Sequence, residues 1–175
     1  MRRISVITVL STFLFAVSAA VALASQSTSV DYGNAPSGTH FATGSTAPVC
    51  TVNSDQSVSC TGTTLGGVGH TNATVSLSAN YTGTVNCYNP SGHLVESHTT
   101  SFSTSSTATA TPTKNGQLTI PPRSTVSPSS VPQTCPNPSW TASFAPGSPT
   151  LTSFTYTVTF AGFTSPFITI TGNDP

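Results

Sequence analysis

The sequence predicts an all-β protein: an antiparallel Greek-key β-sandwich of immunoglobulin-like type with a flexible N-terminal arm. Three observations predict this class. Apolar residues alternate with threonine or serine at period two in several segments, and no segment shows the 3.6-residue period of an amphipathic helix. Serine and threonine make up 61 of the 175 residues, which favours hydroxyl-coated strands. Charged residues are only 5% of the chain, so we expect no nucleic-acid binding, because four basic residues cannot form a basic surface.

The first 24 residues are predicted to be a signal peptide. Two arginines at positions 2 and 3 precede a largely apolar stretch over residues 4–21, and Ala22-Leu23-Ala24 matches a small-x-small cleavage site. We therefore expect a secreted, extracellular product that starts near Ser25 and has no membrane attachment after cleavage. The mature chain keeps two basic and four acidic side chains, a net charge of −2, which steers no particular partner towards it.

The mature chain is predicted to have two parts. Residues 25–48 show no sustained periodicity and are rich in serine, threonine, glycine and proline, so we expect a flexible arm there. The β-sandwich domain is predicted to cover residues 49–175.

The cysteines predict two disulfides. All four, Cys50, Cys60, Cys87 and Cys135, lie in the exported part, and an even number in a secreted chain is typical of a disulfide framework. Of the three possible connectivities we favour Cys50–Cys60 and Cys87–Cys135. A hairpin turn over residues 53–56 would place residue 52 opposite residue 58, and therefore residue 50 opposite residue 60.

The strand signals follow in order along the domain. Residues 73–87 show the longest alternation, either as one long bent strand with a bulge at Gly83 or as two strands. A second clear strand is predicted over residues 154–160. Weaker strand signals cover residues 95–102, 107–111, 117–120, 140–144 and 167–171, with a turn at residues 114–116. Residues 121–139 hold six prolines, too many for a strand ladder, so a long surface crossover is expected there.

Two short motifs carry a resemblance. Cys87-Tyr88-Asn89-Pro90 and Cys135-Pro136-Asn137-Pro138 share the pattern Cys-x-Asn-Pro, and a glycine-rich passage follows Cys60. With the signal peptide, this layout resembles a group of small secreted, uncharacterised proteins of actinobacteria. The resemblance implies a bacterial, threonine-rich, immunoglobulin-like β-sandwich with two disulfides, and it implies no activity.

We expect no enzyme and no cofactor. A serine hydrolase needs a histidine base and a carboxylate beside an activated hydroxyl, and no G-x-S-x-G motif occurs. His93, Glu96 and His98 form an H-x-x-E-x-H cluster that could bind a metal. The spacing matches no recognised ligand set, so three exposed polar residues and no metal site are expected.

Trp140 and Tyr88 are the candidate ligand-binding residues. Exposed aromatic rings on a β-sandwich are able to hold sugar rings. The alternation of Trp140, Ala142 and Phe144 instead favours a tryptophan that packs inward beside the Cys87–Cys135 bridge. The predicted function is that of a secreted, non-catalytic interaction module that binds cell-wall glycan or another extracellular protein. The alternative is a carbohydrate-binding module that uses Trp140 and Tyr88.

Overall fold

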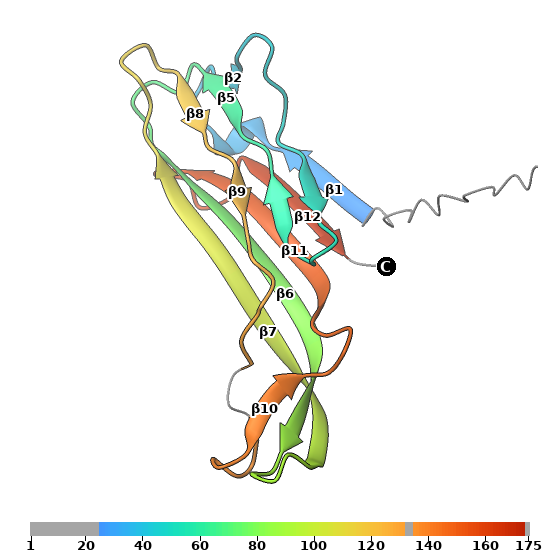
Figure 1. Cartoon of the computed structure of the whole chain (residues 1–175). Helices are drawn as coiled ribbons and strands as arrows, with labels where there is room; N and C mark the ends of the chain where they lie inside the picture. Colours follow the sequence, from blue (N-terminus) through green and yellow to red (C-terminus); the bar gives the residue numbers. More distant parts are fainter. Residues whose placement is uncertain (1–24, 132–134, 174–175) are drawn as a thin grey trace, which may run out of the picture.

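The computed structural model describes residues 25–131 and 135–173, and these residues form an all-β fold of antiparallel sheets packed against each other (Figure 1). No α-helix occurs in the described ranges, whose one helical turn is the 3₁₀ segment η1 (Tyr32–Asn34). Accordingly, none of the described residues forms a helix able to cross a membrane. The predicted all-β antiparallel sandwich is confirmed, whereas its Greek-key and immunoglobulin-like details stay predictions. The predicted signal peptide lies outside the described residues.

The larger sheet has six strands. They are β1 (Ser25–Val30), β6 (Ala73–Tyr88), β7 (Leu94–Ala110), β10 (Thr141–Phe144), β11 (Thr150–Phe160) and β12 (Ile168–Asn173). The order is β1-β12-β11-β6, with β7 on the other edge of β6. β11 pairs with residues 73–82 of β6, and β10 pairs with residues 85–88 further along the same edge. β6 and β7 therefore form a long hairpin that extends from the small strands β2, β5 and β8 to the opposite end of the molecule (Figure 1).

β6 is one continuous strand of 16 residues, which decides between the two arrangements that its alternation allowed. Its odd-numbered apolar residues are buried, as the period-two pattern predicts. No bulge occurs at Gly83. The register shifts instead between Leu151 and Ser153 of β11, and at the end of the hairpin where Cys87 pairs with Glu96. Gly83 has a different role, because a Cβ there would lie 3.3 Å from Cα of Pro149, where the chain passes from β10 to β11.

The N-terminal segment is part of the fold, so the prediction of a flexible arm over residues 25–48 is wrong. All six residues of β1 pair with β12, and the amide of Asp31 donates to the carbonyl of Phe167 at 2.8 Å. Further along, β2 (His40–Phe41) pairs with β5. The physical reason is that β1 is held by backbone hydrogen bonds and by the packing of Val30 on the core, which a serine-rich sequence does not reveal.

The second layer consists of two three-stranded sheets, β2-β5-β8 and β3-β4-β9. The remaining strands are β3 (Cys50–Val52), β4 (Val58–Cys60), β5 (Thr63–Gly66), β8 (Leu118–Ile120) and β9 (Arg123–Ser124). Figure 1 shows β3-β4-β9 over one half of the long β6–β7 hairpin and β2-β5-β8 at the open end of that half. Buried residues of the two layers, such as Leu65 and Ile120 above and Leu77 and Tyr156 below, form one core cluster.

The other half of the hairpin has a small core of its own. Val85, Cys87 and Cys135 are its buried members, and Trp140 and Phe144 pack against it. The proline-rich crossover leads to this core. It contains the two-residue strand β9, which sequence patterning did not predict, and then runs towards β10 (Figure 1).

Both predicted disulfides are confirmed. Cys50 lies opposite Cys60 in the β3–β4 pair, with Thr51 opposite Ser59, as the expected hairpin register requires. Cys87 of β6 is bonded to Cys135, which closes the longer loop with a sequence separation of 48. The described residues hold no free cysteine.

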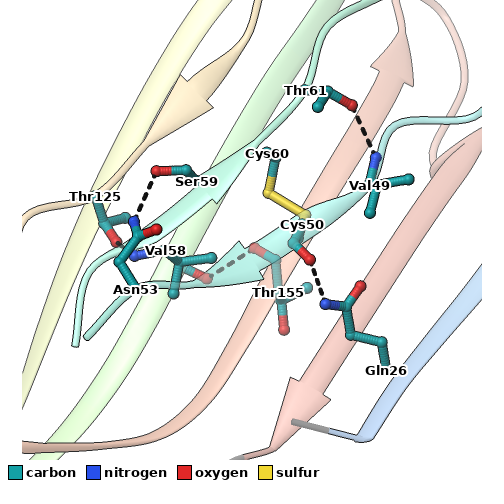
Figure 2. The surroundings of a disulfide bond; sticks show 11 residues. Gln26, Val49, Cys50, Asn53, Val58, Ser59, Cys60, Thr61, Thr125 and Thr155 are labelled. Atoms are coloured by element: carbon teal, nitrogen blue, oxygen red, sulfur yellow. Dashed lines mark hydrogen bonds between the residues drawn. A yellow bond between two sulfur atoms is a disulfide. The ribbon is translucent and has the colours of Figure 1, made fainter. Parts of the chain in front are cut away.

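Figure 2 shows the first disulfide, which joins β3 to β4 within the second layer, and the hydrogen bond that connects this pair to the N-terminal segment. The side-chain amide of Gln26 in β1 donates to the carbonyl of Cys50, and the amide of Val49 donates to Oγ1 of Thr61 at 2.9 Å. The Asn53 amide donates to Oγ of Ser59 at 3.0 Å. Side-chain hydrogen bonds thus support the pairing of β3 with β4 at both ends of the hairpin: Val49 with Thr61 at one end, and Asn53 with Ser59 at the other.

Candidate interaction surface

Trp140 and Tyr88 lie on opposite faces of the large sheet. Tyr88 is opposite Thr141, on the outer face of β6, and its hydroxyl is 3.4 Å from the Asn86 amide nitrogen, which donates to it. Trp140 packs against the inner cluster that contains the Cys87–Cys135 bridge. Both side chains are half-buried rather than exposed. The two rings therefore do not form one binding platform.

The H-x-x-E-x-H residues come together only in part. Glu96 and His98 share the inner face of β7, with Oε1 of Glu96 3.7 Å from Nδ1 of His98. His93 lies in the exposed β6–β7 turn, where its backbone amide donates to Oδ1 of Asn89 at 3.0 Å. Within residues 25–131 and 135–173, no group of three histidine, cysteine, aspartate or glutamate residues is placed to hold a metal ion.

The grooves of the described surface are shallow and lined mainly by small or hydroxyl residues. One of about 480 Å³ lies between residues 44–46, 62–64 and 119–122, and another of about 360 Å³ contains Asp55, Gln56 and Pro149. A hydrogen bond from the Ser57 hydroxyl lowers the pKa of Asp55 and keeps this exposed carboxyl ionised. No histidine lines these two grooves, whereas a third groove, also of about 480 Å³, contains His40 together with Gly66 and Asn115.

Gln56 in the second groove is a structural residue. It is the one non-glycine residue of the described part with a positive φ, at 66°. Its side-chain oxygen accepts the amide hydrogen of Leu151 at 2.7 Å, beside the register shift of β11. Its carbonyl accepts the hydroxyl hydrogen of the buried Tyr81 at 3.1 Å. Gln56 thus supplies a hydrogen-bond acceptor for the Leu151 amide at the register shift of the β6–β11 ladder, and a second acceptor for the Tyr81 hydroxyl.

The free edge of β7 is the most extended unpaired feature of the described chain. β7 has 17 residues, all of which except Val95 pair with β6, and no described strand pairs with its other edge. At about 3.3 Å per residue this edge is roughly 55 Å long. Natural proteins protect such edges with lysine, proline, bulges or short strands. Leu94–Ala110 contains no lysine, arginine, proline or glycine. Its one inward-facing charged residue, Glu96, and its one irregularity, near Val95, both lie at the end of the hairpin, so residues 97–110 have none of these protections.

Four polar side chains lie between the layers beside this edge, and we call them the Arg123 cluster: Arg123, Tyr156, Thr104 and Ser106. Leu77 of β6 has Tyr156 on one side and Ser106 on the other, and Nη1 of Arg123 in β9 donates to Oγ of Ser106 at 3.4 Å. Three buried polar atoms of the cluster have no hydrogen-bond partner: Arg123 Nε, Thr104 Oγ1 and the Tyr156 hydroxyl oxygen. Burial raises the pKa of Tyr156 to about 12 although the Arg123 charge acts in the opposite direction, so this hydroxyl stays protonated.

Comparison with protein-family models, with curated proteins and with solved structures found no match to this chain.

Sequence reasoning missed both the β7 edge and the Arg123 cluster. The inner face of β7 carries Glu96, His98, Thr100, Thr104 and Ser106, which break the apolar alternation that signals a half-buried strand. Arg123 follows two prolines in a segment predicted as crossover. One signal was present: the only basic residue between Lys114 and the end of the chain is Arg123.

Proposed function

We propose that the protein is a secreted, non-catalytic interaction module of the cell envelope or extracellular space, and that its interface is the free edge of β7. The observation that carries the proposal is the length of this edge together with its lack of protecting residues over residues 97–110. An added strand would satisfy backbone amide and carbonyl groups that the described fold leaves without a strand partner.

One further feature supports the extracellular location. Disulfides persist in oxidising compartments, and this small domain has two of them. A polypeptide partner is favoured over cell-wall glycan, because a strand edge recognises backbone groups and the two candidate aromatic rings lie on opposite faces.

Hydrogen–deuterium exchange of the mature protein tests the interface. In the presence of its partner, the amides of Leu94–Ala110 should gain protection from exchange. The amides of β12, which pairs with β1 on one edge and β11 on the other, should keep the same protection. The partner here is either a cell-envelope extract or a high concentration of the protein itself. Absence of added protection in β7 under both conditions would overturn the proposal.

Lysine variants supply the matched comparison. Ser103→Lys/Ser105→Lys adds two charges to the exposed face of the edge strand and should abolish the protection. Thr159→Lys/Thr171→Lys adds the same charge to inner strands of the same sheet and should leave the protection unchanged. Equal effects of both pairs would show that net charge, not the edge, governs binding. Separately, labelling of the mature protein by a serine-hydrolase probe would contradict the non-catalytic assignment.

A further inference from the structure

The Arg123 cluster lies beside β7, whose outer edge has no described strand partner. On its other sides it is enclosed by core residues such as Leu77 and by β9 of the second layer. Thr104 and Ser106 face inward, yet they are only half-buried, because no described strand lies beyond β7. A side chain that reaches the cluster from outside would therefore come from a strand added to this edge.

The cluster has donors but no matching negative charge. A guanidinium carries five N–H donors, and the one bond found for Arg123 is the 3.4 Å contact with Ser106. The single ion pair of the described residues is His98–Glu96, so Arg123 has no carboxylate within ion-pair distance there. A partly buried arginine is normally paired, and a carboxylate is its best planar partner.

The chain itself carries a suitable carboxylate on the same strand and the same face. Glu96 is the only acidic residue of β7, and it faces inward like Ser106 and Thr104 because all three are even-numbered positions. Two antiparallel copies of β7 with Glu96 opposite Ser106 would bring Glu96 of each copy beside Arg123 of the other. In that register Ser101 lies opposite Ser101 on the two-fold axis.

We propose that the partner of the β7 edge is a second copy of this chain, paired antiparallel over residues 96–106 about a two-fold axis at Ser101. The inference rests on the proposed function and names its partner. The register has two further features in its favour: it places Thr100 opposite Phe102, a β-branched and aromatic pair, and His98 opposite the unpaired hydroxyl of Thr104. The two six-stranded sheets become one continuous sheet with the outer hydroxyl faces on the same side.

Cross-linking at the axis tests the register. Ser101 is exposed, and the four natural cysteines are all in disulfides, so Ser101→Cys adds a single free thiol. With oxidised glutathione, this variant should form a covalent dimer on non-reducing gels, because directly opposed strand residues lie within disulfide reach. Ser105→Cys is the matched control. Its partner in this register is Ser97, so it should give at least tenfold less dimer. Comparable cross-linking of the two variants would overturn the proposal.

Charge exchange tests the contact between Glu96 and Arg123. In analytical ultracentrifugation, Glu96→Gln and Arg123→Gln should each raise the dimer dissociation constant at least tenfold. Glu96→Arg alone should do the same, and Glu96→Arg/Arg123→Glu should restore dimerisation. A dimer that is insensitive to all of these substitutions would refute the contact, and circular dichroism verifies that each variant is folded.

The two proposals fail in different ways. A monomer at all concentrations whose β7 amides become protected by cell-envelope extract would refute self-association and leave the proposed function standing. Failure to protect β7 under any condition would refute both.

Discussion

Removal of the Cys87–Cys135 bridge should destabilise the fold more than removal of Cys50–Cys60. The two bridges close loops with sequence separations of 48 and 10. Loop-closure entropy gives about 4 kcal/mol for the longer loop and about 2.7 kcal/mol for the shorter one, a difference of about 1.4 kcal/mol. The structure adds a reason for the same order: the β3–β4 ladder holds Cys50 near Cys60 without the bond, whereas Cys135 follows a long proline-rich segment.

Alanine is the appropriate replacement at all four positions. The cysteines are 0% to 9% exposed, and a buried serine hydroxyl without a partner would add a cost of about 1–3 kcal/mol that has nothing to do with the bridge. Cys87→Ala/Cys135→Ala and Cys50→Ala/Cys60→Ala each remove two buried sulfur atoms, so the cavity contributions largely cancel in the comparison.

The assay is urea denaturation of the mature protein, with thermal unfolding as a second measurement. We expect the Cys87/Cys135 variant to lose about 1–1.5 kcal/mol more than the Cys50/Cys60 variant, or roughly 3–6 °C in Tm. A Cys50/Cys60 variant that loses as much or more would refute the reasoning. It would mean that the crossover is held in place by its own packing.

Three smaller predictions follow from single contacts. Gln56→Ala should lower the free energy of unfolding by about 1–2 kcal/mol, since the Leu151 amide loses its acceptor, and Gln56→Glu should lose less in the same urea titration. Gly172→Ala should cost roughly 1–3 kcal/mol, because an added Cβ would overlap the ring of the buried Phe154; if Gly172→Ala/Phe154→Leu is no more stable than the sum of its single variants, the overlap is not the cause. Because the pKa of Tyr156 is about 12 in the folded protein and 10.0 is the ordinary value, the unfolded chain releases this proton first, and stability falls by roughly 2–3 kcal/mol between pH 10 and pH 12. Tyr156→Phe should remove that fall, and an equally steep pH profile of the variant would contradict the assignment.

Much of the fold was predictable from local patterns. The alternation over residues 73–87 and 154–160 predicted the two central strands, because a sheet with one buried face requires period two. The β3–β4 register followed from a short turn, and both disulfides followed from that register. Local patterns did not predict β1, because its pairing with β12 joins residues more than 130 positions apart.

The candidate surface was less accessible to sequence reasoning. Trp140 was correctly expected to pack beside the Cys87–Cys135 bridge, because its neighbours Ala142 and Phe144 share its alternation. Nothing local places Arg123 beside Tyr156, since these residues come from different layers. That Tyr88 and Trp140 occupy opposite faces also depends on the β6–β10 register.

The sequence by itself determined the class of the fold, the pairing of the cysteines and the wet and dry faces of the central strands. These properties depend on residue type and on spacings of a few residues, which the backbone geometry of a strand converts directly into position. The tertiary structure alone decided that β7 would have the longest free edge, that the serine-rich N-terminal segment would pair with β12 at the opposite side of the sheet, and that Arg123 would lie beside the edge of β7. The physical reason is that sheet order is set by long-range backbone pairing, which is available to every residue and therefore leaves little trace in side-chain pattern.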